Sequence, residues 1–165
     1  MQEKEVTMAV ETCLVFMMNG SYYAVDVAYA GSVENDAKIQ QMPGVPSCLL
    51  GVTLIRDEII PVVDLRSHFN LPPLSAGEPY NIIIGNLDGN TVAYQVDEIH
   101  SITNLEFGEM SVAPLMLRSA TGCVQKVTML GEKVVVLIDL ISILTDAEKT
   151  AIFDFVKSLN EKEEE

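Results

Sequence analysis

Hydrophobic and polar residues follow one another along this chain in short runs, each about five to eight residues long. The runs are rich in Val, Ile and Tyr and are separated by turn-forming residues, as between Ile59–Val63 and its neighbours. A period of two is typical of strands that bury one face, and short continuous apolar runs are typical of strands buried on both faces. The pattern predicts an all-β protein.

Two blocks of this pattern occur twice and in the same order. Residues 14–33 (LVFMMNGSYYAVDVAYAGSV) resemble residues 83–102 (IIGNLDGNTVAYQVDEIHSI), and residues 51–65 (GVTLIRDEIIPVVDL) resemble residues 126–140 (KVTMLGEKVVVLIDL). The offset between the copies is slightly larger for the second block than for the first, so one insertion or deletion between the blocks relates the copies. We interpret this as a duplicated β unit, although unrelated β-hairpins also resemble one another by chance.

The turns of these hairpins carry residues suited to positive φ angles. Asn19-Gly20, Asp88-Gly89 and Gly131 supply such turns, whereas the fourth equivalent turn, at Arg56-Asp57, has no glycine. Asp57 is therefore expected to adopt a left-handed conformation, which an aspartate tolerates less readily than glycine.

The C-terminal region has a different period. Thr145 and Glu148 have the spacing of a capping box, and an apolar stripe at helical spacing follows: Ala147, Ala151, Ile152, Phe155, Val156 and Leu159. We predict an amphipathic helix over residues 146–160 and an acidic tail over residues 161–165. The stripe is expected to pack on the β-structure, with a groove of a partner protein as the alternative.

Composition narrows the function classes. A formal net charge of −14 argues against nucleic acid as a partner, because such binding requires Lys and Arg to neutralise phosphates. The apolar runs are far shorter than the roughly 20 residues that cross a membrane. The polar start, residues 1–11, lacks the pattern of a secretory signal and is expected to be a tail, so we expect a cytoplasmic protein. Three widely spaced cysteines, Cys13, Cys48 and Cys123, favour buried reduced thiols over disulfides.

Residues 51–65 also resemble the central signature of the CheW-like family of bacterial chemotaxis coupling proteins, which typically reads GVxNLRGxIIPVxDL. Shorter matches to this family lie in the expected order over residues 12–145: Tyr23–Val27, Met42–Gly44, Val96–Ile99 and Val136–Leu140.

The resemblance implies a fold and a role. The fold would be two five-stranded SH3-like β-barrels side by side, which we assign to residues 12–72 and 73–145, with the C-terminal helix after them. The role would be that of a non-catalytic adaptor, located in the cytoplasm at receptor arrays beneath the inner membrane. Its partners would be the cytoplasmic tip of a chemoreceptor and the regulatory domain of a CheA-type histidine kinase, which has the same fold. No cofactor is implied.

The resemblance also points to partner-binding residues. Arg56 matches the signature arginine of the coupling surface, and its planar fork of donors suits a carboxylate or backbone carbonyls; an intramolecular salt bridge is the alternative. Gly51 matches the signature glycine, for which either the close approach of another strand or a β-bulge is a sufficient reason. Three positions depart from the family pattern: Leu54 replaces Asn, Asp57 replaces Gly, and Ser32 replaces an acidic residue. We include these three in the candidate surface.

Other polar residues were weighed for catalysis. Asp64 and Asp139 end equivalent hairpins, where an Asp readily caps a following helical turn, and we favour this role over a catalytic pair. Asp64, Arg66 and His68 would share a face only on an extended strand, and neither His68 nor His100 has a second ligand at metal-binding spacing. We therefore expect no metal site and no enzyme. A β-barrel that binds a small ligand, or catalyses a reaction through Asp64, Arg66 and His68, is the alternative function.

Overall fold

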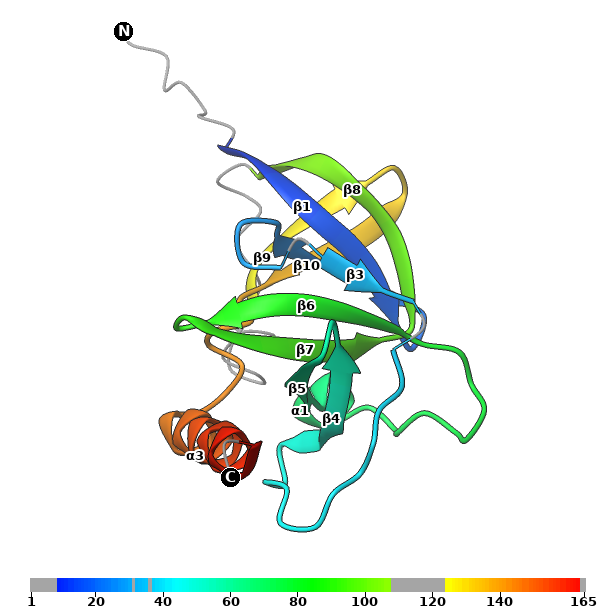
Figure 1. Cartoon of the computed structure of the whole chain (residues 1–165). Coiled ribbons are helices and arrows are strands. Elements are labelled where there is room, and N and C mark those ends of the chain that lie inside the picture. The colour runs from blue at the N-terminus through cyan, green and yellow to red at the C-terminus, as the bar shows by residue number, and fades with distance from the viewer. Residues whose placement is uncertain (1–8, 31, 36, 108–123, 164–165) are drawn as a thin grey trace, which may run out of the picture.

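The computed structural model describes residues 9–30, 32–35, 37–107 and 124–163, which form two five-stranded sheets and a long C-terminal helix (Figure 1). The strands are β1 Ala9–Met18, β2 Ser21–Asp26, β3 Ser32–Glu34, β4 Leu49–Ile55, β5 Glu58–Val63, β6 Asn81–Leu87, β7 Asn90–Val96, β8 Glu98–Phe107, β9 Val124–Leu130 and β10 Lys133–Ile138. The helices are α1 Leu65–His68 and α3 Asp146–Glu163. The predicted fold class, two five-stranded β units followed by a helix, is confirmed.

The two sheets have the same strand order, but they are interleaved in sequence. The first sheet has the order β8-β1-β2-β10-β9, and the second has the order β3-β6-β7-β5-β4. Each copy of the repeat therefore places its first hairpin in one sheet and its last three strands in the other. The predicted lobes, residues 12–72 and 73–145, consequently do not coincide with the two sheets.

The strand register confirms the duplication residue by residue. The central strand pairs of the two sheets are related by the same two offsets that relate the repeated blocks in the sequence. These pairs are Ala24 with Val15 and with Leu137 in the first sheet, and Ala93 with Ile84 and with Val62 in the second. The pairing of Ala24 with Leu137 joins the parallel strands β2 and β10, and that of Ala93 with Val62 joins the parallel strands β7 and β5. A local turn cannot specify a parallel pair.

The chain crosses between the sheets twice, between β2 and β3 and at Asp97 between β7 and β8, before β9 and β10 complete the first sheet. The proline-rich segment 71–79 connects α1 to β6 and so remains with the second sheet. A hairpin is encoded locally by its turn, whereas the choice of partner hairpin depends on contacts between distant strands. The sequence pattern therefore revealed the repeat without revealing the exchange of strands.

Three hydrophobic clusters hold the sheets together. Each barrel has a small core of its own, which contains Val15 and Leu137 in the first and Val62 and Ala93 in the second. The largest cluster lies between the sheets and takes residues from both, including Phe16. Strand β1 is thus buried on both faces, which explains its continuous apolar sequence.

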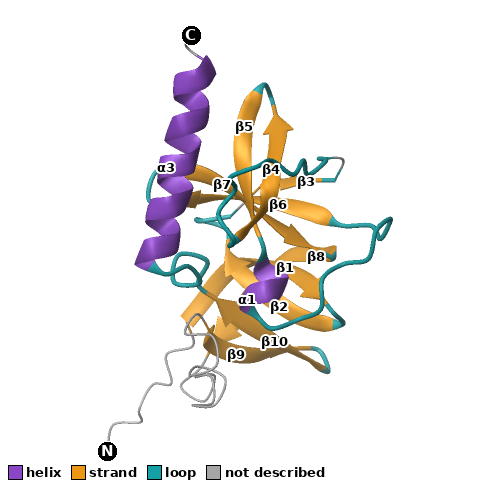
Figure 2. Cartoon of the chain, turned by 90° about the horizontal axis from the view of Figure 1, so that it is seen from below, coloured by secondary structure: helices purple, strands orange, loops and turns teal. Residues whose placement is uncertain are grey.

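Helix α3 lies alongside the second sheet (Figure 2). Ile152 is fully buried and Leu159 nearly so, and both belong to the predicted apolar stripe. Burial of one such side chain contributes about 1.5–3 kcal/mol. The stripe therefore packs on the β-structure as expected, except that its first residue, Ala147, is exposed. The helix also continues to Glu163, so the predicted acidic tail at 161–165 begins later than expected.

Candidate functional site

The β4–β5 hairpin ends in a strained turn that exposes Arg56. Ile55 and Glu58 form the last cross-strand pair, so Arg56 and Asp57 are a two-residue turn. Their φ angles are +52° and +66°, which confirms the left-handed conformation predicted for Asp57 and adds Arg56 to it. This conformation costs residues other than glycine about 1–2 kcal/mol each. Both residues are exposed, so the turn presents the guanidinium of Arg56 to solvent.

Arg56 forms no hydrogen bond or ion pair with the other residues that the structure describes. The three ion pairs found among them join Arg66 to Asp97, His68 to Glu148 and Lys126 to Glu11. The intramolecular salt bridge considered for Arg56 is therefore not formed within this part of the chain. Its five N–H donors remain available for a partner.

Beside this turn, β4 borders an apolar groove of about 530 Å³, which we call the β4 groove. Its lining residues are Ala37, Lys38, Gln40, Met42, Val52, Thr53, Leu54 and Ile59. Leu54 is 64% exposed, and it pairs across the hairpin with Ile59. Leu54 is thus part of a contiguous apolar surface with the groove residues Val52 and Ile59, and such a surface is typical of a site that binds another molecule.

Gly51 brings another segment of backbone close to β4. A Cβ atom at Gly51 would lie 2.3 Å from the carbonyl oxygen of Gln40, and its φ angle is +155°. Gln40 and Val52 exchange two backbone hydrogen bonds, of 2.7 and 2.9 Å. The β4–β5 register also shifts at this point. Both reasons considered for Gly51, close approach and a bulge, therefore apply, and Gly51 shapes one wall of the β4 groove.

The β9–β10 hairpin of the other sheet has an apolar cross-strand pair at the positions equivalent to exposed Leu54 and half-buried Ile59. Met129 and Val134 are cross-strand partners, and they are 55% and 54% exposed. In the alignment of the second repeated block they are the equivalents of Leu54 and Ile59. We refer to these two surfaces as the hairpin faces. Met129 and Val134 lie outside the family signature, and only the repeat relates them to Leu54 and Ile59.

Ser32 lies away from the hairpin in the sheet order. It is on β3 and pairs with Ile84 of β6, whereas β4 is at the opposite end of the same sheet. Next to it is an open groove of about 540 Å³, lined by Val33, Asn35, Asn81, Glu98 and Ile99, which we call the junction groove. Residues from three strands of both sheets meet there. Of the five candidate residues, the structure groups Gly51, Leu54, Arg56 and Asp57 on one hairpin and leaves Ser32 beside the junction groove.

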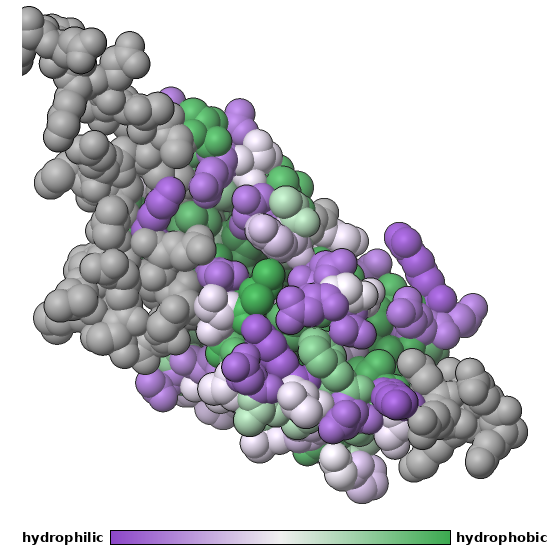
Figure 3. Space-filling model, turned by 90° about the vertical axis from the view of Figure 1, so that its left-hand side faces the viewer, coloured by the Kyte–Doolittle hydropathy of each residue, from purple (hydrophilic) through white to green (hydrophobic). Residues whose placement is uncertain are grey.

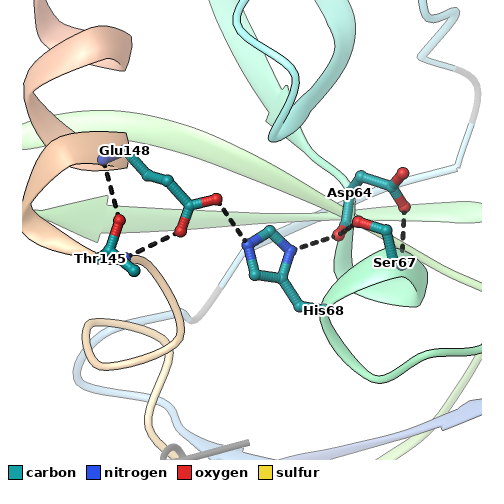
Figure 4. Close-up of polar contacts among 5 residues, drawn as sticks. All are labelled: Asp64, Ser67, His68, Thr145 and Glu148. Carbon is teal, nitrogen blue, oxygen red and sulfur yellow. Dashed lines mark hydrogen bonds and ion pairs between the residues drawn. The ribbon is translucent and has the colours of Figure 1, made fainter.

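The residues considered for catalysis do not converge. The carboxylate of Asp64 accepts a hydrogen bond of 3.2 Å from the backbone N–H of Ser67, which confirms its role as the cap of α1. His68 Nδ1 lies 2.7 Å from the carbonyl oxygen of Asp64, and Nε2 lies 3.3 Å from Glu148 (Figure 4). Arg66 turns away to Asp97.

The second candidate carboxylate is also structural. Asp139 accepts hydrogen bonds from the backbone N–H of Ile141, at 3.0 Å, and from the hydroxyl of Ser142, at 2.7 Å. At the start of α3, Thr145 and Glu148 form the predicted capping box, with bonds of 2.9 and 3.1 Å (Figure 4). These carboxylates satisfy backbone donors at the ends of β-strands and helices.

Two described cysteines are free and buried, Cys13 and Cys48. Burial raises the pKa of the Cys13 thiol to about 12, and the nearby carboxylates of Glu11 and Asp26 add to this rise. Burial also raises the pKa of the Cys48 thiol, as does the charge of Glu148. Since the thiolate is the reactive form, neither cysteine suits nucleophilic chemistry. Cys123 lies outside the described residues.

Three further properties of the described residues concern metal binding, membrane crossing and the polarity of the surface. Within them, no group of three or more His, Cys, Asp or Glu side chains could hold a metal ion. None of the helices traced there is long and apolar enough to cross a membrane. On the molecular face shown in Figure 3, hydrophilic and hydrophobic residues are interspersed rather than gathered into one broad patch.

Comparisons with known proteins point to one family. Residues 12–148 match the family model of the CheW-like domain. A chemotaxis protein CheW of Bacillus subtilis is 35% identical over 104 residues, which cover 63% of this chain and 67% of that protein. A chemotaxis protein CheW of Klebsiella aerogenes is 25% identical over 146 residues, 88% of each chain. The crystal structure of the scaffolding protein TtCheW from Thermoanaerobacter tengcongensis superimposes with a TM-score of 0.68 at 25% identity and covers 80% of this chain and 90% of that one.

Proposed function

The chain belongs to the family of CheW-like domains, and we propose that it is a non-catalytic adaptor that couples chemoreceptor cytoplasmic tips to a CheA-type histidine kinase. An adaptor requires at least two partner surfaces on one rigid body. The two hairpin faces are the observation that best supports this role, because each has an apolar cross-strand pair at equivalent positions of the repeat, with Leu54 exposed in the first and both Met129 and Val134 exposed in the second. We place the protein in the cytoplasm, at receptor arrays beneath the inner membrane.

We assign the hairpin faces to the kinase. The regulatory domain of such a kinase is expected to have the same duplicated fold, and so to carry hairpin faces of its own. Two hairpin faces have apolar side chains at their centres, which suits an interface with a few buried anchors. Arg56, which has Gly131 as its equivalent in the other copy, adds an anchor to one face only and so distinguishes the two.

We assign the junction groove to the receptor tip. A groove suits a helical segment of a partner, whereas a free strand edge suits another strand. The junction groove is open and combines apolar Val33 and Ile99 with polar Asn35, Asn81 and Glu98. Its residue Val33 directly follows Ser32, the position at which the family more often has an acidic residue. This assignment separates the two partners on the molecule, so that both can bind at once.

The experiment is a titration of the protein against a receptor cytoplasmic fragment and against a kinase regulatory domain, each in isolation. We expect binding to both. Arg56→Glu should weaken kinase binding by more than about tenfold, since loss of an anchor residue typically costs about 2 kcal/mol or more and about 1.4 kcal/mol corresponds to tenfold. Lys157→Glu, a charge reversal at an exposed position of α3, is the matched control and should leave both affinities unchanged.

Three results would contradict the proposal. Lack of binding to both partners would refute the adaptor function itself. Unchanged kinase affinity in Arg56→Glu, with the fold intact, would remove Arg56 from the interface. Loss of receptor binding but not of kinase binding in Leu54→Asp and Met129→Asp would reverse the assignment of the surfaces.

A further inference from the structure

Asp97 is the residue at which the chain crosses from the second sheet to the first. It follows β7 and precedes β8, and hydrogen bonds join it to both sheets. On the side of the first sheet, its backbone N–H donates to the carbonyl oxygen of Met17 on β1 at 3.1 Å. Its carboxylate accepts the backbone N–H of Asn19, in the β1–β2 turn, at 2.8 Å.

On the side of the second sheet, the partner of Asp97 is Arg66. The guanidinium binds the carboxylate through two atoms, Nε to Oδ1 at 3.2 Å and Nη2 to Oδ2 at 2.6 Å. Its remaining terminal nitrogen donates to the carbonyl oxygen of Pro72, in the segment that follows α1. The side chain of Arg66 is only 8% exposed and that of Asp97 is 21% exposed. A two-point contact between planar groups fixes an angle as well as a distance.

The same residue also adjoins the junction groove. Asn81, which lines that groove, donates to the backbone carbonyl oxygen of Asp97 at 3.2 Å, and Glu98 and Ile99 of the groove are its immediate successors in the chain. Arg66 lies in α1, which directly follows β5 of the hairpin that carries Arg56. The ion pair thus joins the residue next to the junction groove to the helix that follows the first hairpin.

The other copy of the repeat lacks this ion pair. When the alignments of the two repeated blocks are extended to these positions, the equivalents of Arg66 and Asp97 are Ile141 and Ala28. The fold therefore tolerates an uncharged pair at the first crossing and retains a charged pair at the second. Replacing a buried ion pair by apolar residues is often neutral for stability, so a role in specifying geometry is the better reason for such a pair.

We propose that the Arg66–Asp97 ion pair is a positioning lock, which fixes the orientation of the two sheets and thereby the geometry between the junction groove and the hairpin faces. The shared apolar core keeps the sheets together, but the hydrophobic effect is non-directional, so the two-point ion pair adds a directional restraint on rotation of one sheet against the other. This inference rests on the proposed adaptor function, because the geometry matters only when a receptor and a kinase are bound together.

The test compares the wild type with Arg66→Lys and with the double variant Arg66→Ile plus Asp97→Ala, which copies the pair of the other repeat. Residual dipolar couplings of backbone amides report the orientation of the two sheets without a partner. In the wild type, both sheets should fit one alignment tensor. In the double variant, they should need two tensors, and Arg66→Lys, which keeps the charge but loses the fork, should fall between them.

The consequence is measured by binding. Each partner alone should bind the double variant as it binds the wild type, because Arg66 and Asp97 line neither proposed surface and Asn81 bonds to the backbone carbonyl of Asp97, which Asp97→Ala retains. The gain in affinity for the second partner when the first is bound should fall by about tenfold, a usual size for coupling between sites. Should Arg66→Lys not fold, the double variant still provides both measurements, since it leaves no unpaired charge.

Two outcomes would overturn the lock: one tensor for both sheets in the double variant, or two tensors with coupling equal to that of the wild type. Failure of the adaptor function would look different. The wild type would then bind neither partner, while its dipolar couplings and those of the variants would still decide whether the ion pair fixes the orientation.

Discussion

The Arg56-Asp57 turn should lower the stability of the folded protein, and substitutions within the turn should raise it. The Asp88-Gly89 turn has φ angles of +51° and +88° and ends in glycine. At Arg56-Asp57 the angles are +52° and +66° with no glycine. Asp57→Gly removes a left-handed conformation that costs about 1 kcal/mol or more, and Arg56→Asn substitutes a residue that tolerates it better.

Together, the substitutions Arg56→Asn and Asp57→Gly should raise the free energy of unfolding by about 1–2 kcal/mol, from the conformational cost of two left-handed residues. For a chain of this size, 1 kcal/mol corresponds to a rise in Tm of about 2–4 °C. Urea unfolding and calorimetry measure both quantities. Under the proposed function, kinase binding should weaken by more than about tenfold, because the guanidinium is lost while the hairpin is improved.

The converse substitution is the control. Asp88→Arg with Gly89→Asp transfers the unfavourable turn to the β6–β7 hairpin, and it should lower stability by a similar amount without affecting either partner. The reasoning is refuted if Arg56→Asn with Asp57→Gly leaves stability unchanged or lower, since the positive φ angles would then carry no cost. Retention of full kinase affinity by the stabilised variant would show that Arg56 is not an anchor.

Three further predictions concern stability and reactivity. Gly51→Ala should cost clearly more in urea unfolding than Gly77→Ala, because a Cβ at Gly51 meets a backbone carbonyl at 2.3 Å while Gly77, also at positive φ, has open space; equal costs would contradict this. Thr145→Ala should lose about 1 kcal/mol by calorimetry through loss of the α3 cap, and an unchanged Tm would contradict it. Cys13 should resist iodoacetamide at pH 8 until the protein unfolds. The pKa of Cys13 is about 12 in the folded protein and 9.0 in the unfolded chain, so above pH 9 only the unfolded chain loses the proton. The free energy of unfolding should therefore fall above pH 9 by up to about 1.4 kcal/mol per pH unit, and Cys13→Ala should remove this contribution.

The hairpins and their register could be predicted from the sequence because both are encoded locally. The turn at Asn19-Gly20 fixes β1 against β2, and the alignment of the first repeated block then gives the pairing of β6 with β7. The pairing of whole hairpins could not be predicted, because β3 pairs with β6 and β8 with β1 across long stretches of chain. Residues 12–72 therefore looked like a complete lobe although their first hairpin belongs to the other sheet.

The candidate site was predictable to the same extent. Arg56, Leu54 and Asp57 lie on one hairpin, so a linear signature was sufficient to group them. The junction groove takes Val33 and Ile99 from strands that are distant in the chain, and no motif links them. The pairing of Arg66 with Asp97 also joins residues that are distant in the chain, so the sequence groups Arg66 only with its neighbours Asp64 and His68.

The differences between the two copies are where selection for something other than folding is most visible. Both copies solve the same folding problem, with the same strand order and register, so either residue at an equivalent pair of positions is compatible with the fold. At one such pair the copies have Gly131 and the less favourable Arg56, and at another they have Ile141 and the buried, charged Arg66. Stability alone would favour the glycine and gain little from the ion pair. Function therefore explains the two arginines best: Arg56 would contact a partner at a hairpin face, and Arg66 would fix the angle between the sheets.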